Sequence, residues 1–182
     1  MTIQITISGL PRHQIKSGAR RQSNHDHLTT SWLKKKLRLA LPMTAARSGS
    51  WHIDLIADAA MTEIHQRTLG INTTTDVLTF DLRDHTTDRR FLELETLIGW
   101  EVACRQARQF HHPVAWEVLL YAIHSLLHVQ GYDDRTPRQA RRIHRREDQI
   151  LLALGIGPVY AAGANAGLQT RLKGVGNTMV RT

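Results

Sequence analysis

Four stretches of the chain have the hydrophobic pattern of β-strands. Residues 1–8 alternate isoleucine with polar side chains, as in a strand with one buried face, and WHIDLIA at 51–57 alternates in the same way. The segment TDVLTFDL at 75–82 is rich in β-branched and aromatic residues, which favour strands. A fourth strand is expected over 97–103, although the wider segment 92–110 also fits a partly helical structure.

Helical patterns alternate with these strands. Apolar residues recur at helical spacing over 31–40 and again over 61–69. The segment 114–130 is apolar nearly all round, which is typical of a helix buried in the middle of a domain. A last helix is expected to begin at Pro137, a residue favoured in the first turn, and to end at Gly155.

This order of elements predicts one domain over residues 1–160, in which helices cover a small sheet of about four strands. Residues 12–27 are polar and basic and are expected to form a loop. Residues 161–182 contain several glycines and few large apolar side chains, so we expect them to form a flexible C-terminal tail.

The predicted buried helix carries two histidines, in the sequence HSLLHVQGYDD. His124 and His128 are four residues apart, so a helix places both imidazoles on one face, where they can chelate one divalent metal ion. Gly131 can adopt a left-handed conformation and turn the chain back, which brings Asp133 or Asp134 toward the same ion. Two histidines and one carboxylate leave a coordination position open for water, as in catalytic zinc sites.

The same residues allow two other interpretations. Histidines at this spacing also occur on helices that bind no metal, and Asp133 and Asp134 are suited to a turn before Pro137. The spacing H-x3-H-x2-G-x2-D also occurs in zinc proteases that carry a glutamate directly after the first histidine as general base. Ser125 stands at that position here and cannot act as that base, which disfavours the protease.

The charge of the chain points to a polyanionic partner. Of the 182 residues, 24 are Lys or Arg and 16 are Asp or Glu, which gives a net charge of +8 and an isoelectric point near 10.4. Such a surplus favours nucleic acid before a membrane surface. No apolar run approaches the roughly 20 residues of a membrane-spanning helix, and the N-terminus does not resemble a secretory signal. The single cysteine, Cys104, agrees with a reducing cytoplasm.

Arginines gather just after the candidate metal ligands and form a candidate RNA-binding surface. They are Arg135, Arg138, Arg141, Arg142, Arg145 and Arg146. Lys34, Lys35 and Lys36 form a second basic group, and both groups could instead be solvated helix faces. Aromatic residues make up only 5% of the chain, so we expect recognition of RNA shape rather than extensive base stacking.

The sequence HSLLHVQGYDD closely resembles the H-G-x-L-H-L-x-G-Y-D-H signature of the YbeY family, bacterial endoribonucleases that mature rRNA. Upstream, TDVLTF at 75–80 is similar to the family's T-D-V-L-S-F strand. Downstream, the helix with Glu147 and Asp148 is similar to the family's last helix. The resemblance extends from about Ile53 to Tyr160.

The resemblance implies a fold, a cofactor and partners. The fold is a single α+β domain with a small mixed sheet and a central buried helix that carries the metal-binding histidines. The family's three metal-binding histidines correspond to His124, His128 and position 134, which together would hold one zinc ion or another divalent metal. The implied partners are rRNA and the small ribosomal subunit, with ribosomal proteins or an assembly GTPase beside them, in the cytoplasm and without a membrane.

The chain departs from the family pattern at four positions. Asp134 replaces the third histidine, and an aspartate oxygen is a competent zinc ligand that also suits harder metals. Ser125 replaces the usual glycine and Thr74 the usual proline. The family arginine before the T-D-V-L strand is Leu69 here, and Arg67, two residues earlier, is a candidate substitute.

The sequence thus predicts a metal-dependent endoribonuclease of single-strand type in rRNA processing, with 16S rRNA 3′-end maturation and ribosome quality control as the implied pathway. The predicted catalytic and metal-binding residues are His124, His128 and Asp134. The predicted RNA-binding residues are Arg135, Arg138, Arg141, Arg142, Arg145 and Arg67. A ribosome assembly factor with a mainly structural metal is the alternative, and a zinc metalloprotease is a weaker one.

Overall fold

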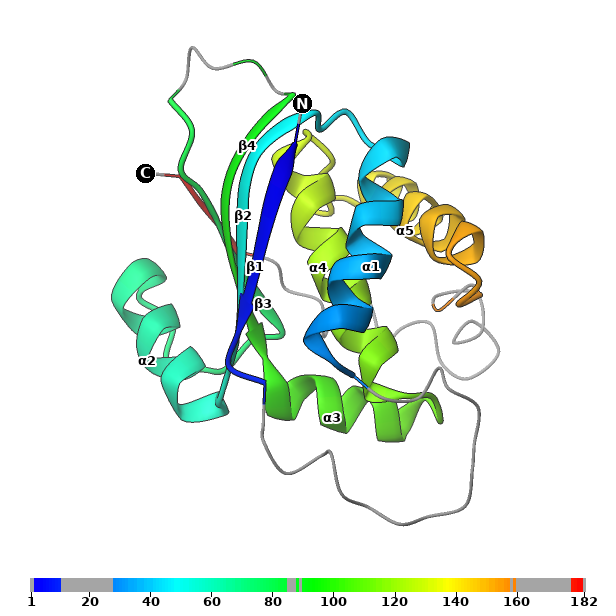
Figure 1. Ribbon diagram of the computed structural model, residues 1–182. Helices are drawn as coiled ribbons and strands as arrows, with labels where there is room; N and C mark the ends of the chain where they lie inside the picture. The colour runs from blue at the N-terminus through cyan, green and yellow to red at the C-terminus, as the bar shows by residue number, and fades with distance from the viewer. Residues whose placement is uncertain are drawn as a thin grey trace.

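A five-stranded mixed sheet with the strand order β1-β2-β4-β3-β5 forms the frame of the protein (Figure 1). The computed structural model describes residues 2–10, 28–84, 88, 90–157, 159 and 178–181. The strands are β1 (Ile3–Ser8), β2 (Ser48–Ile56), β3 (Val77–Asp81), β4 (Phe91–Gly99) and β5 (Thr178–Arg181). β1 and β4 run parallel to β2, β3 runs antiparallel to β4, and β5 runs parallel to β3.

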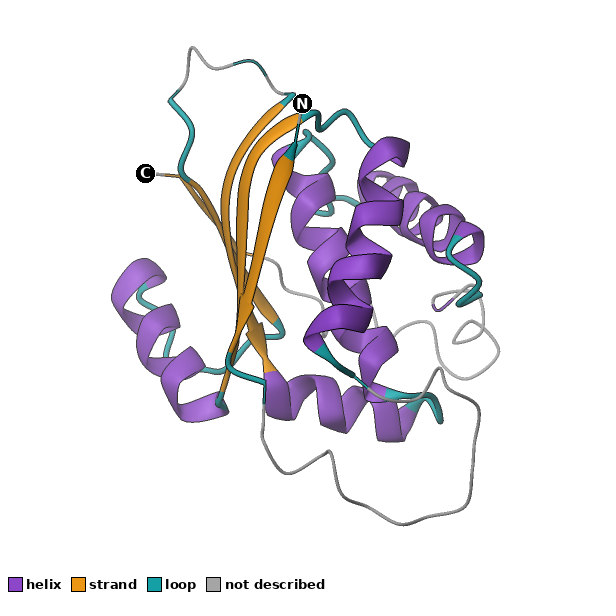
Figure 2. Cartoon of the chain, in the orientation of Figure 1, coloured by secondary structure: helices purple, strands orange, loops and turns teal. Residues whose placement is uncertain are grey.

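The described part of the chain forms five α-helices, which lie on both faces and at one end of the sheet (Figure 2). They are α1 (Thr30–Ala40), α2 (Asp58–Leu69), α3 (Trp100–Gln109), α4 (Val114–Val129) and α5 (Pro137–Ala153), and a 3-10 turn (Leu41–Met43) follows α1. α1, α4 and α5 lie on one side of the sheet and α2 lies on the other. No helix in the described ranges combines the length and the apolar character needed to cross a lipid bilayer.

Helix α4 is the centre of the hydrophobic core, as its pattern predicts. All of its residues except Val114 and Trp116 are buried. It lies between the sheet on one side and α1 and α5 on the other, so apolar side chains are needed around its whole circumference. Its polar residues therefore need partners inside the core, because an unpaired buried polar group costs about 1–3 kcal/mol.

Four buried polar side chains fix α4 on the sheet. Ser125 Oγ accepts a hydrogen bond from Thr79 Oγ1 at 2.9 Å and lies 2.7 Å from Thr96 Oγ1. Trp51 Nε1 donates to Thr96 Oγ1 at 2.9 Å. The serine that departs from the family pattern thus joins α4 to β3 and β4 directly, and to β2 through Thr96 and Trp51.

One predicted strand is wrong in its position. The sequence indicates a strand over 97–103, whereas β4 ends at Gly99 and α3 begins at Trp100. The chain changes structure at Gly99, where a Cβ atom would come within 2.6 Å of the carbonyl oxygen of Thr75. The strand also begins earlier than predicted, at Phe91. The sequence does not reveal this start, because the spacing of the glutamates in this segment fits either a strand or a helix.

The ends of the chain contribute one strand that the sequence does not predict. The expected loop at 12–27 lies outside the described residues, as do residues 161–177 and 182 of the expected flexible tail. Residues 178–181 form β5 at the edge of the sheet beside β3. The predicted sheet of about four strands therefore gains a fifth.

Candidate metal centre

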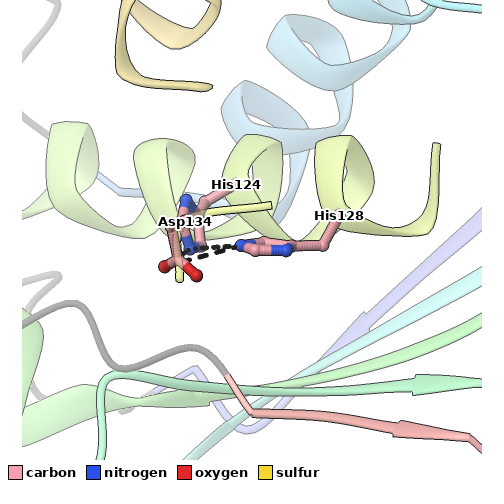
Figure 3. Close-up of side chains that lie close together, drawn as sticks. All are labelled: His124, His128 and Asp134. Atoms are coloured by element: carbon pink, nitrogen blue, oxygen red, sulfur yellow. Dashed lines mark hydrogen bonds and ion pairs between the residues drawn. The ribbon is translucent and has the colours of Figure 1, made fainter. Parts of the chain in front are cut away.

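The two histidines of α4 and the carboxylate of Asp134 converge on one point (Figure 3). The Nε2 atoms of His124 and His128 are 3.0 Å apart. Asp134 Oδ2 lies 3.9 Å from His124 Nε2 and 3.8 Å from His128 Nε2. His124 is fully buried and Asp134 keeps 18% of its side chain exposed, so the cluster is closed on the core side and reaches solvent through the aspartate.

The turn after α4 decides which aspartate joins the histidines. Gly131 adopts φ 93°, the left-handed conformation that ends the helix and reverses the chain. Asp133 Oδ1 accepts hydrogen bonds from the backbone N–H groups of Asp134 and Arg135, so Asp133 stabilises the turn. Asp134 is left to face the histidines, which removes the alternative that the sequence leaves open.

A third acidic residue, Glu147 on α5, lies behind His124. Its Oε1 is 2.5 Å from His124 Nδ1 and its Oε2 is 3.0 Å from His144 Nδ1. The carboxylate is fully buried. Histidine ligands of metals commonly donate their second N–H to a carboxylate, which fixes the tautomer and the ring orientation.

Neither Glu147 nor His144 is predicted as a functional residue from the sequence. A signal exists, because Glu147 lies on the face of α5 that buries Ile143, Ile150 and Leu151. A glutamate at such a position must have a buried partner.

The charges of the cluster set the pKa values of its members. Burial opposes ionisation of Glu147, yet the positive charges and hydrogen bonds of His124 and His144 lower the pKa of its carboxyl to about 2. Burial opposes protonation of His124, but Glu147 outweighs it and raises the pKa of that imidazole. Burial and the charge of His124 lower the pKa of His128 to about 3.

The donor set fits a divalent cation. In a tetrahedral site with ligand distances of about 2.0–2.2 Å, ligand atoms lie about 3.3 Å apart, and the two Nε2 atoms already lie at 3.0 Å. Ionised Glu147 is an acceptor, so the Nδ1 of His124 carries a proton, and in the neutral ring its Nε2 has a lone pair directed at the cluster. Two imidazoles and one aspartate are a donor set that suits zinc and also harder divalent metals.

The predicted arginines lie in three places: on α5, in the turn before it and on α2. Arg138, Arg141 and Arg145 are exposed on α5, the helix that carries Glu147, and the guanidinium of Arg142 lies 5.0 Å from the ring centre of Tyr132. Arg145 Nε also donates to the carbonyl oxygen of Arg141 at 3.2 Å. The remaining three arginines have partners in the protein as well, and two of them lie outside α5. Arg135 pairs with Asp133, Arg146 donates to the backbone of Met43, and Arg67 pairs with Glu63 on α2. Since α2 covers the opposite face of the sheet, the structure does not bring Arg67 to the arginines of α5 (Figure 1).

Comparison with known proteins gives the chain a family. The family model described as endoribonuclease YbeY matches residues 14–155. The chain belongs to the endoribonuclease YbeY family. The match includes α4, the turn after it and α5, which supply the three candidate metal ligands and Glu147.

Individual members of the YbeY family agree with this assignment, and one solved structure shares the fold. The chain is 31% identical to endoribonuclease YbeY of Chlorobium phaeovibrioides over 125 residues, 69% of this chain and 82% of that protein. It is 31% identical to endoribonuclease YbeY of Moorella thermoacetica over 112 residues, 57% of this chain and 72% of that protein. The solution structure of TM1509 from Thermotoga maritima shares the fold, with a TM-score of 0.52 at 18% identity over 86% of this chain and 95% of that one.

Leu69, which stands where the family resemblance places an arginine, serves the core. It packs against a small apolar cluster of Met61, Leu78 and Leu97 beneath α2. The side chain at this position therefore contributes to the stability of the protein.

Asp76, immediately before β3, is a buried carboxyl group with an unusual pKa. Its Oδ1 accepts hydrogen bonds from Val77 N at 2.9 Å and Thr75 Oγ1 at 3.1 Å, whereas Oδ2 has no hydrogen-bond partner among the described residues. Burial raises the pKa of Asp76 from the usual 3.8 to about 6, against the opposing charge of His124 and these hydrogen bonds. The folded protein therefore holds this proton more tightly than the unfolded chain, and stability is lost as the pH rises from 3.8 to about 6.

Replacing Asp76 by asparagine is expected to stabilise the protein at neutral pH. At pH 7.5 the free energy of unfolding should rise by about 2–3 kcal/mol, because the amide keeps an oxygen acceptor and carries no charge. At pH 4 the two proteins should be nearly equal. Urea unfolding of chelator-treated protein measures both, with Asp84→Asn, at an exposed position, as control. A less stable D76N protein at pH 7.5 would refute the explanation.

Proposed function

We propose that the chain is a metal-dependent endoribonuclease that cleaves rRNA. The observation that carries the proposal is the convergence of His124, His128 and Asp134, backed by buried Glu147, in a member of an endoribonuclease family. The finer proposal is maturation of the 3′ end of 16S rRNA and ribosome quality control in the cytoplasm, on the small ribosomal subunit. Ribosomal proteins or an assembly GTPase would be further partners, and zinc is the proposed ion.

In this proposal His124, His128 and Asp134 hold the ion. A divalent ion with three protein ligands supplies an activated water and polarises a phosphoryl oxygen. Glu147 accepts a hydrogen bond from the Nδ1–H group of His124 and so keeps the Nε2 lone pair directed at the cluster. Asp134, the most exposed of the three with 18% of its side chain accessible, lies on the side from which the RNA phosphate would approach.

The exposed arginines of α5, the helix that also carries Glu147, are the proposed phosphate-binding surface. Arg138, Arg141 and Arg145 are exposed there. Guanidinium groups bind phosphates in bidentate geometry and offset the negative charge that develops on a phosphodiester during cleavage. They recognise the backbone rather than the bases, in agreement with the low aromatic content of the chain.

A salt titration tests this surface. The affinity for a structured RNA should fall steeply with salt, and replacing Arg138, Arg141 and Arg145 together by glutamine should reduce the log–log slope by about 2. Arg67→Gln, an exposed arginine on the opposite face of the sheet, is the control and should leave the slope unchanged. An unchanged slope in the triple variant would remove α5 from the RNA-binding surface.

Cleavage of a structured rRNA fragment by the pure protein, with and without a chelator, tests the proposed function. We expect cleavage that the chelator abolishes and that added divalent metal restores. The His124→Ala variant, purified through the same steps, controls for contaminating nucleases. Cleavage that survives the chelator would contradict the proposal.

The second candidate is a ribosome assembly factor whose metal is mainly structural. Leu69 favours it, because a packed leucine occupies the position of the family arginine. The two functions differ in the effect of metal removal. If the metal is structural, the chelator should sharply lower the melting temperature, and RNA should not be cleaved with or without the chelator.

A further inference from the structure

The exposed cations of α1 and α5 have no acidic partners in the described part of the chain. α1 contains no acidic residue, and its Lys35 and Arg38 are exposed. Neither of them forms an ion pair with a described residue, and the same is true of Arg138 and Arg141 on α5. The positive charge of these two helices is therefore not neutralised by the protein. Four exposed arginines elsewhere do have carboxylate partners, in the pairs Arg67–Glu63, Arg90–Asp88, Arg105–Asp58 and Arg135–Asp133.

Two side-chain hydrogen bonds join α1 to α5. Lys36 Nζ donates to the carbonyl oxygen of Leu154 at 2.6 Å. Arg146 Nη2 donates to the carbonyl oxygen of Met43, in the 3-10 turn after α1. The middle of each helix thus meets the end of the other, so the two helices run side by side in opposite directions. Both cover the same side of the sheet (Figure 1), and their exposed residues form one surface there.

α5 separates α1 from the metal cluster. The ring of His144 is stacked on that of His124 with centroids 6.5 Å apart, whereas Arg146 reaches Met43. Residues two apart on a helix point about 200° away from each other, so the cluster and α1 lie on opposite sides of α5. A strand of RNA that extends from the cluster to α1 would therefore cross the exposed arginines of α5.

We propose that α1 belongs to the RNA-binding surface, with Lys35 and Arg38 binding backbone phosphates of the same RNA beyond the arginines of α5. This inference rests on the proposed function. Trp32, the aromatic residue of α1, packs against the core, and Lys36 lies 5.9 Å from the centre of its ring. The surface therefore offers charge rather than a stacking platform for bases, and the phosphate backbone supplies the neutralising charge that the protein lacks.

Removing the two exposed charges of α1 tests the proposal. With chelator present, so that RNA stays intact, fluorescence anisotropy measures the affinity for a structured RNA over a range of salt concentrations. We expect Lys35→Gln combined with Arg38→Gln to weaken binding roughly 10-fold at about 0.1 M salt and to reduce the log–log slope by about 1 to 2. Arg67→Gln combined with Arg105→Gln removes the same charge from α2 and α3 and should leave both quantities unchanged. Wild-type affinity and slope in the α1 variant would overturn the proposal.

A second variant separates charge from shape. Lys35→Arg combined with Arg38→Lys keeps both charges and should bind RNA as the wild-type protein does. A loss of affinity equal to that of the glutamine variant would overturn the proposal, since the effect would then not be one of charge. The melting temperature of the glutamine variant should not fall, because like charges are removed from an exposed helix face.

Vesicles that contain phosphatidylserine test the other polyanionic partner. If the glutamine variant loses affinity for these vesicles and keeps wild-type affinity for RNA, α1 is a membrane-binding surface and the proposal is wrong. Wild-type protein that binds RNA through α1 and does not cleave it would instead refute the proposed function.

Discussion

Replacing His128 by alanine is expected to abolish metal binding and RNA cleavage while the protein stays folded. His128 supplies one of the three converging ligand atoms. Loss of groups that merely support metal ligands weakens binding by about 10-fold to 100-fold, so loss of a ligand should exceed that range. Metal content by elemental analysis and cleavage of a structured RNA by gel assay measure the two effects.

The fold of the variant is checked against metal-free wild-type protein. His128 is buried, so its truncation leaves a small cavity on α4, and the melting temperature should fall by a few degrees relative to that reference. His52→Ala is the control, because His52 is a histidine on β2 outside the cluster and should keep full metal content and activity. Cleavage at the wild-type rate by a folded His128→Ala protein would show that the cluster is not the reaction centre.

Glutamine at position 147 is expected to weaken both the metal centre and the fold. The two carboxylate oxygens accept hydrogen bonds from the Nδ1–H groups of His124 and His144, and in glutamine an NH2 donor replaces one of these oxygens, so one of the two hydrogen bonds is lost. Breaking a fully buried ion pair costs about 3–5 kcal/mol, and loss of a carboxylate behind a histidine ligand costs about 10-fold to 100-fold in metal affinity. Chemical denaturation and chelator competition measure the two losses.

The effect of Glu147 depends on pH with a definite sign. The pKa of its carboxyl falls from the usual 4.5 to about 2 in the folded protein, so its contribution to stability is present above pH 4.5 and is lost as the pH falls toward 2. The stability difference between wild type and Glu147→Gln should therefore shrink over that interval. Glu63→Gln, an exposed glutamate on α2, is the control and should show no such change. A difference that is constant with pH would refute the role of the ionised carboxylate.

Two features of the sequence predict α4 as the helix that carries the candidate metal ligands. A helix that is apolar all round must be buried, and histidines four apart on such a helix must share a face. α4 and the convergence of His124 and His128 confirm both expectations. Spacing alone leaves Asp133 and Asp134 open, and the sequence favours Asp134 only through the family resemblance; in the structure the hydrogen bonds of Asp133 to the turn leave Asp134 facing the histidines.

Other parts of the fold depend on contacts distant in sequence. Glu147 meets His124 across 23 residues of chain, and nothing local to α5 names its partner. The boundary between β4 and α3 is fixed by the close approach of Gly99 to Thr75, and β5 forms only by pairing with β3. Packing between residues distant in sequence determines each of these features, whereas the local hydrophobic pattern predicts α1, α2, α4 and α5.

The central claim is that His124, His128 and Asp134 hold one ion whose coordination is left incomplete by the protein. Elemental analysis combined with X-ray absorption spectroscopy, on protein purified without added metal, tests it most directly. The account predicts one divalent ion per chain, bound by two imidazole nitrogens and one carboxylate oxygen at about 2.0–2.2 Å, with solvent oxygen completing the shell. A protein that contains no metal after purification and takes up none when a divalent metal is added would contradict it, as would an ion enclosed by four protein ligands.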